Sequence, residues 1–111
     1  MTDMTDNRKI VFIAEHYGLA HQLMKTAEEA AELVRAAVRM LDAVQEDVDD
    51  ETAHADGVAL ARGALIEELA DVLIMVEQLI CLTDCDVAVR GMMQIKLDRQ
   101  MERIQKETGG Q

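Results

Sequence analysis

Apolar residues recur at spacings of three and four along almost the whole chain, and this periodicity is typical of helices. The chain contains no proline, the residue that would break or kink a long helix. Half of its 111 residues are hydrophobic, but Phe12 and Tyr17 are the only aromatic ones. We therefore predict an all-α fold whose core is built from leucine, valine, isoleucine, methionine and alanine.

The length suits a single domain over residues 1–111. We expect an antiparallel bundle of four helices, at about residues 6–16, 19–46, 56–82 and 86–106. Gly18 is the predicted end of the first helix, and Asp86 is the predicted N-cap of the fourth. The sequence EDVDDETAHAD, at residues 46–56, is predicted to be a solvated loop, and residues 107–111 a frayed tail.

Two helices carry the expected core. The second has an apolar seam, which we predict to be buried, at Leu23, Ala27, Ala30, Val34, Ala37 or Val38, Leu41 and Val44. In the third, eleven of the fourteen residues from Leu69 to Leu82 are apolar, so this helix must be covered on several sides.

The charge balance excludes some functions. A formal net charge of −11 would repel a nucleic-acid backbone. The acidic N-terminus lacks the apolar stretch of a secretory signal, and no apolar run reaches the roughly 20 residues of a membrane span. Cys81 and Cys85 lack the neighbours of a zinc site and are expected to be thiols. We therefore expect a cytoplasmic protein that binds neither nucleic acid nor membrane.

Two acidic clusters indicate chemistry. Glu28, Glu29 and Glu32 crowd one face of the second helix, where a solvated charged face paired with Lys25 and Arg35 is the simplest interpretation. In the third helix, however, Glu68 and Asp71 begin the apolar run, where an ionised carboxylate costs several kcal/mol unless it is paired or bound to metal. If the two faces meet, four carboxylates form a cage for a hard cation, Mg²⁺ first and Mn²⁺ second. The cage ligands would be Glu29, Glu32, Glu68 and Asp71. A di-iron bundle is disfavoured, because its Glu-x-x-His motif occurs once, at Glu51 and His54.

The sequence EEAAE at residues 28–32 and the sequence ELAD at residues 68–71 resemble the paired motifs of the MazG-like all-α nucleoside triphosphate pyrophosphohydrolases. The flanking YG, QLMK, DVLIM, KLDR and RI sequences are similar too, over roughly residues 8–105. The resemblance implies hydrolysis of an NTP or dNTP to the monophosphate and pyrophosphate, with Mg²⁺ on the four cage carboxylates. It also implies nucleotide-pool cleaning by an obligate homo-oligomer, a dimer or a tetramer.

Several residues have expected roles in such a reaction. Lys25 and Glu28 are the candidate catalytic residues, Glu28 by orienting or deprotonating the attacking water. Phosphate would be bound by Lys25, Lys96, Arg99 and Arg103, the last three from a neighbouring subunit or, alternatively, merely forming a solvated helix face. Tyr17 is the candidate base-binding residue.

Two alternatives stay open. Phosphoribosyl-ATP pyrophosphohydrolases share much of the motif but usually have Tyr-His where this chain has Ile74 and Met75. A non-catalytic helical dimerisation or adaptor protein would also explain the acidic charge and the apolar third helix, but not the position of Glu68 and Asp71. The absence of tryptophan and of an Asn between the late Lys and Arg leaves the base preference open.

Overall fold

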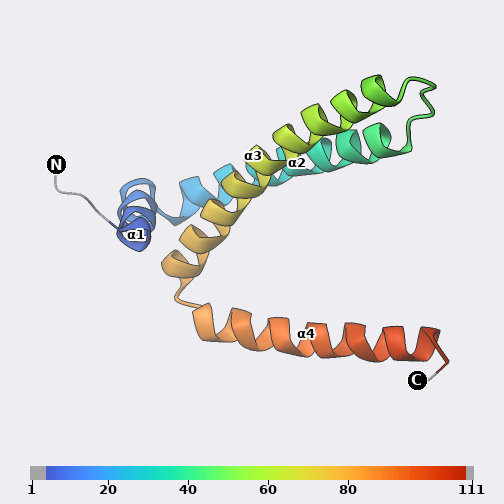
Figure 1. The fold of residues 1–111 in the computed structure, drawn as a ribbon. Coiled ribbons are helices and arrows are strands. Elements are labelled where there is room, and N and C mark those ends of the chain that lie inside the picture. The colour runs from blue at the N-terminus through green and yellow to red at the C-terminus, as the bar shows by residue number, and fades with distance from the viewer. Residues whose placement is uncertain (1–4, 110–111) are drawn as a thin grey trace.

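The computed structural model describes residues 5–109, and over this range the chain forms four helices and no strand. The predicted all-α class is confirmed. In chain order the helices are α1 (Asp6–Tyr17), α2 (Leu19–Gln45), α3 (Glu51–Thr83) and α4 (Asp86–Glu107). Figure 1 shows α2 and α3 side by side, α1 across their lower end, and α4 as a separate arm.

The junction between α1 and α2 is a single glycine. The backbone N–H of Gly18 donates to Ala14 O at 2.8 Å, and its φ of 83° is one that residues with a Cβ rarely adopt. At the other end of α1, the side chain of Thr5 accepts a hydrogen bond from the backbone N–H of Arg8 at 3.3 Å, as an N-cap does. Gly18 is therefore the helix boundary that the sequence predicted.

The acidic loop is shorter than predicted, because α3 begins at Glu51 and not near residue 56. Asp50 is its N-cap, and one carboxylate oxygen accepts from the backbone N–H groups of Thr52 at 2.9 Å and Ala53 at 3.3 Å. An N-cap aspartate satisfies donors that the first helical turn leaves free. The loop between α2 and α3 thus contains residues 46–50 only.

The turn before α4 also differs from the prediction. Asp86 is the first helical residue and not the N-cap; Cys85 precedes it and makes no capping hydrogen bond through its side chain. Asp84 ends α3 in the left-handed conformation, with φ 50° and ψ 51°, which aspartate tolerates better than most residues. Of the predicted tail, Glu107 is still helical, and residues 110–111 lie outside the described range.

Helices α2 and α3 form an antiparallel hairpin whose interface repeats every seven residues. The buried residues of α2 are Gln22, Glu29 and Ala36, and α3 places Ala61, Glu68 and Met75 at the same interval. A seven-residue period keeps one narrow stripe of each helix facing its neighbour. Apart from Met75, the hairpin interface is therefore made of small and polar residues, with a glutamate in each helix at its centre.

The predicted apolar seam of α2 is not buried within one chain. Leu23, Val34, Val38, Leu41 and Val44 are each at least half exposed. They lie on the face turned away from α3, because the stripe that contains Glu29 occupies the hairpin interface. Buried apolar residues within the described range are limited to Ala14, Ala36, Ala61 and Met75.

Helix α4 does not complete a four-helix bundle within one chain. It touches only α3 among the other helices and has no buried residue (Figure 1). The radius of gyration of 18.8 Å exceeds the roughly 13 Å expected of a compact chain of this length. The four-helix bundle prediction is therefore wrong for the single chain: α1, α2 and α3 pack together, and α4 extends away from them.

Within residues 5–109, no helix has a stretch that is both apolar enough and long enough to cross a lipid bilayer.

Candidate functional site

The two acidic motifs meet at the centre of the hairpin. Glu29 of α2 and Glu68 and Asp71 of α3 each place one carboxylate oxygen within 4.8 Å of the others. Glu68 and Asp71 are one turn apart on α3, and the heptad register of the hairpin sets Glu29 opposite them. Three of the four predicted metal ligands thus form one oxygen cluster.

Two oxygens of this cluster have no protein partner. Glu29 Oε2 and Glu68 Oε2 are buried and accept no hydrogen bond from any described residue. Glu29 as a whole is only 8% exposed, and its other oxygen, Oε1, forms an ion pair with Lys25 Nζ at 3.3 Å. Buried carboxylate oxygens without a donor are costly, and a bound cation removes that cost. The donor set, carboxylate oxygen only, fits Mg²⁺ or Mn²⁺.

Glu32, the fourth predicted ligand, lies beside Glu68. Both glutamates line a cleft of about 160 Å³ between α2 and α3. The pKa of Glu68 is raised above its ordinary value of 4.5, first by burial and then by the negative charges of Glu32 and Asp71. Mutual repulsion among carboxylates is the electrostatic condition that a dication relieves.

The reason that the sequence offered for a metal at Asp71 is only partly correct. Asp71 is exposed in the single chain, and so are its apolar neighbours Leu69, Leu73 and Ile74. The most buried residue of the cluster is Glu29, which the sequence places in a charged group on α2. The sequence pattern did not predict the burial of Glu29, because α2 turns its acidic face, and not its apolar seam, toward α3.

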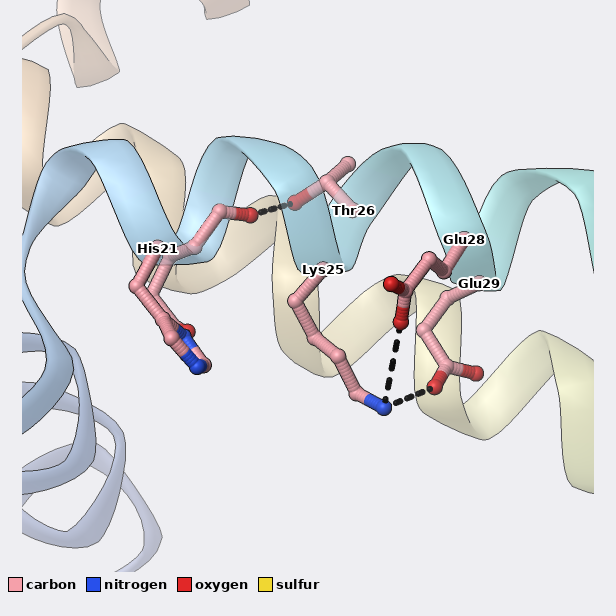
Figure 2. Close-up of polar contacts among 6 residues, drawn as sticks. His21, Lys25, Thr26, Glu28 and Glu29 are labelled. Carbon is pink, nitrogen blue, oxygen red and sulfur yellow. Dashed lines mark hydrogen bonds and ion pairs between the residues drawn. The ribbon is translucent and has the colours of Figure 1, made fainter.

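Lys25 connects the cluster to Glu28. Lys25 Nζ lies 3.3 Å from Glu29 and 3.7 Å from Glu28, and Figure 2 shows the lysine pointing toward both carboxylates. Its pKa is raised, first by the hydrogen bond to Glu29 and next by the negative charges of Glu29 and Glu28. Lys25 is therefore a cation at neutral pH, and Glu28, whose side chain is 63% exposed, is reachable by water.

A pocket of about 440 Å³ adjoins Lys25 and Glu28 on the side of α1. Tyr17, the predicted base-binding residue, is on its wall, half exposed and stacked on His21 with ring centroids 4.6 Å apart. The other lining residues are Ile13, His21, Gln22, Lys25, Glu28, Met75 and Gln78.

The polar wall of this pocket was not predicted. Gln22 Nε2 donates to Gln78 Oε1 at 2.5 Å, and His21 Nδ1 lies 2.6 Å from Gln22 Oε1. Both glutamines are almost fully buried, at 3% and 2% exposure. The sequence spacing could have indicated both glutamines. Gln22 lies seven residues before Glu29, and Gln78 lies seven residues after Asp71, so each shares a helix face with a carboxylate of the cluster.

The basic residues of α4 do not reach the cluster of their own chain. Lys96, Arg99 and Arg103 are exposed, and α4 makes no contact with α2. Besides Lys25, two basic residues lie near the acidic site: Arg35 and Arg39 of α2, which line the cleft beside Glu32 and Glu68. Neither arginine is among the predicted phosphate-binding residues, although both fall within two turns of Glu32.

Comparison with known proteins yields no relative for this chain: no family model matches it, no curated protein matches its sequence, and no solved structure matches its fold.

Proposed function

We propose that this protein is a Mg²⁺-dependent nucleoside triphosphate pyrophosphohydrolase of the MazG-like type, which hydrolyses an NTP or dNTP to the monophosphate and pyrophosphate. The observation that carries the proposal is the oxygen cluster of Glu29, Glu68 and Asp71, with one buried, unpartnered oxygen on each glutamate. A merely solvated acidic face, the simpler interpretation, has no reason to bury acceptors without donors.

In the proposed site, Glu29, Glu68 and Asp71 hold Mg²⁺, and Glu32 contributes the fourth carboxylate from beside Glu68. When bound, the ion would supply positive charge to the phosphate oxygens of the substrate. Lys25 adds a second positive charge at the same edge, because its ammonium group is kept protonated by Glu29 and Glu28. Mn²⁺ suits the same oxygen donors.

Glu28 is the proposed acceptor of the water proton. Its carboxylate is solvent-accessible, sits one residue from Glu29, and is held by Lys25 at 3.7 Å. The water oxygen bonds to one phosphorus of the α–β anhydride, that anhydride bond breaks, and the proton passes to Glu28. General-base assistance of this kind typically contributes 10²–10⁴-fold, roughly.

The nucleoside would lie in the pocket beside Lys25. A volume of about 440 Å³ is within the usual range of small-molecule sites, roughly 300–1,000 Å³. Tyr17 offers an aromatic face, and Gln22 and Gln78 add amide groups to the lining of the pocket. This arrangement supports the base-binding role of Tyr17 and adds the two glutamines to it.

A homo-oligomer is part of the proposal. The outward faces of α2 and α4 carry large apolar side chains that one chain leaves exposed, among them Val38, Leu41, Met92 and Leu97. Apolar patches of this extent are unusual on monomers and are commonly covered by another subunit. A second copy is the occupant we propose, and its α4 would be the source of Lys96, Arg99 and Arg103 at the site.

The test is pyrophosphate and monophosphate release from a panel of NTPs and dNTPs, with and without Mg²⁺. Asp71→Asn and Glu32→Gln should each abolish turnover while the helical circular dichroism signal is kept. Glu67→Gln is the matched control, because Glu67 is an exposed carboxylate next to the site that is not among the cluster residues. Release that needs both the metal and Asp71 would support the enzyme.

Wild-type turnover by Asp71→Asn and Glu32→Gln would contradict the site as described. If folded and oligomeric protein releases no pyrophosphate from any nucleotide of the panel, the adaptor interpretation is favoured. Turnover of phosphoribosyl-ATP alone would favour a phosphoribosyl-ATP pyrophosphohydrolase.

A further inference from the structure

A small cleft runs from the acidic cluster away from the nucleoside pocket. Its volume is about 160 Å³, or roughly five water molecules at about 30 Å³ each. Glu32 and Glu68 form the end nearest the cluster, and Arg35 and Arg39 form the other. Ala36 and Ala64 also line the cleft, and their short side chains leave room between the helices.

The two arginines have no ionic partner in the part of the chain that the structure describes. No carboxylate oxygen lies within 4.0 Å of either guanidinium group, although Glu32 and Asp42 are each three residues away from one of them on α2. Arg35 and Arg39 are one turn apart, so both project from the same face of α2. Together they present fixed positive charge and two planar sets of donors to the cleft.

The position of the cleft determines how the proposed substrate is oriented along the axis of α2. At a rise of about 1.5 Å per residue, Gln22 precedes Glu29 by roughly 10 Å, and Arg39 follows Glu32 by roughly 10 Å. The carboxylate cluster thus lies between an amide-lined pocket of about 440 Å³ and an arginine-lined cleft of about 160 Å³. A nucleotide laid along this line with its nucleoside beside Tyr17 extends its terminal phosphates toward Arg35 and Arg39.

We propose that Arg35 and Arg39 bind the β- and γ-phosphates of the substrate, and therefore the pyrophosphate product, on the far side of the carboxylate cluster from the nucleoside. This inference rests on the proposed hydrolysis and assigns the phosphate-binding role within one chain to α2. Guanidinium groups match phosphate oxygens with paired, charge-assisted hydrogen bonds, which makes arginine well suited to this task. The negative charges of Glu32 and Glu68 at the near end repel a free anion unless Mg²⁺ is present, so pyrophosphate binding should require the metal.

The test is calorimetric titration of the full-length protein with inorganic pyrophosphate, with and without Mg²⁺. The double variant Arg35→Gln/Arg39→Gln should weaken pyrophosphate binding in Mg²⁺ at least tenfold, because it removes the charge-assisted hydrogen bonds that the two guanidinium groups would donate to the phosphate oxygens. Arg62→Gln is the matched control, because Arg62 is an exposed arginine of α3 that lines neither the cleft nor the pocket beside Tyr17. Binding of Mg²⁺ alone, measured in the same variants, should be kept.

A second readout separates binding of the product from folding. Inhibition of turnover by added pyrophosphate should weaken in the double variant, while inhibition by the nucleoside monophosphate stays within twofold of wild type. Arg35→Lys/Arg39→Lys should recover part of the pyrophosphate affinity, because lysine keeps the charge without the paired donors.

Failure of this inference and failure of the proposed function give different results. If the wild-type protein hydrolyses nucleotides but the double variant binds pyrophosphate as tightly as wild type does, the arginine site alone is overturned. If the wild-type protein binds pyrophosphate and the double variant does not, but the wild-type protein hydrolyses no nucleotide, the arginine site stands and the proposed hydrolysis is overturned. No pyrophosphate binding by wild type in Mg²⁺ would also overturn the arginine site.

Discussion

Glu29 and Glu68 face each other across the α2–α3 hairpin, each with its Oε2 atom buried and without a hydrogen-bond donor among residues 5–109. The hairpin therefore concentrates like charge at the centre of its own interface. Ala36 and Ala61 in the next heptad let the helices approach closely, and this close approach holds the two carboxylates together. The proposed metal site depends on that pair.

Neutralising one member should not destabilise the metal-free protein. Glu68→Gln removes repulsion with Glu32 and Asp71 and replaces a buried charge by an amide, so the free energy of unfolding should stay the same or rise. The measurement is urea denaturation in EDTA, with Glu67→Gln as the exposed control. A loss of several kcal/mol on Glu68→Gln would mean that the carboxylate makes a stabilising contact in the metal-free fold.

Stability of the metal-free protein should depend on pH through Glu68. Its folded pKa lies above the ordinary value of 4.5, so its contribution to stability is complete below pH 4.5 and is lost as pH rises through the folded pKa. Glu29, Glu32 and Asp71 surround it, and Lys25 is the nearby cation. Lowering the pH from 7 toward 4.5 should therefore raise this group's contribution, and Glu68→Gln should flatten the dependence. An identical pH profile for wild type and Glu68→Gln would contradict the electrostatic description.

The buried amide pair should behave as one unit. Gln78→Leu leaves the Nε2 group of Gln22 buried without its acceptor, which should cost about 1–3 kcal/mol. Changing both residues, as Gln22→Leu/Gln78→Leu, should recover part of that loss because no amide remains unpaired between them. Denaturant unfolding of the two single variants and the double variant measures the coupling. Additive losses would show that the hydrogen bond between Gln22 and Gln78 has little energetic weight.

The exposed seam of α2 should be covered in solution. Analytical ultracentrifugation should find the wild-type protein as a dimer or tetramer, and Val38→Glu/Leu41→Glu should shift it toward monomer, because both side chains are about half exposed in one chain. Arg62→Glu, a charge change at an exposed α3 position, is the control. A monomeric wild type at micromolar concentration would contradict the oligomer.

The sequence predicted the helical class and the boundary at Gly18, because these depend on local periodicity and spacing. The carboxylate cage was predicted only on the condition that the two acidic faces meet. The sequence did not predict which face of α2 enters the hairpin. An apolar seam and a stripe containing Gln22 and Glu29 both repeat at helical intervals. A single sequence does not show which of these two faces packs against α3 and which packs against another subunit.

The same limit applies to the basic residues around the cluster. Lys96, Arg99 and Arg103 form the most basic stretch of the sequence, but their distance from the cluster depends on how α4 leaves the turn at Asp84. Arg35 was interpreted only as an ion-pair partner of the acidic face, because a basic residue one turn from a carboxylate usually indicates a surface ion pair. Arg39, three residues before Asp42, fits the same pattern. Their shared place on the cleft wall becomes evident only when α3 lies beside α2.

The most direct test of the central claim is titration of the protein with Mn²⁺, followed by electron paramagnetic resonance of the free ion and competition with Mg²⁺. Saturable binding that is lost in Glu29→Gln and Glu68→Gln, and kept in Glu67→Gln, is the result that a metal site between α2 and α3 predicts. Equal, weak binding by all four proteins would show that the cluster is only a repulsive acidic patch. The proposed Mg²⁺-dependent hydrolysis would then have no metal site and would be contradicted.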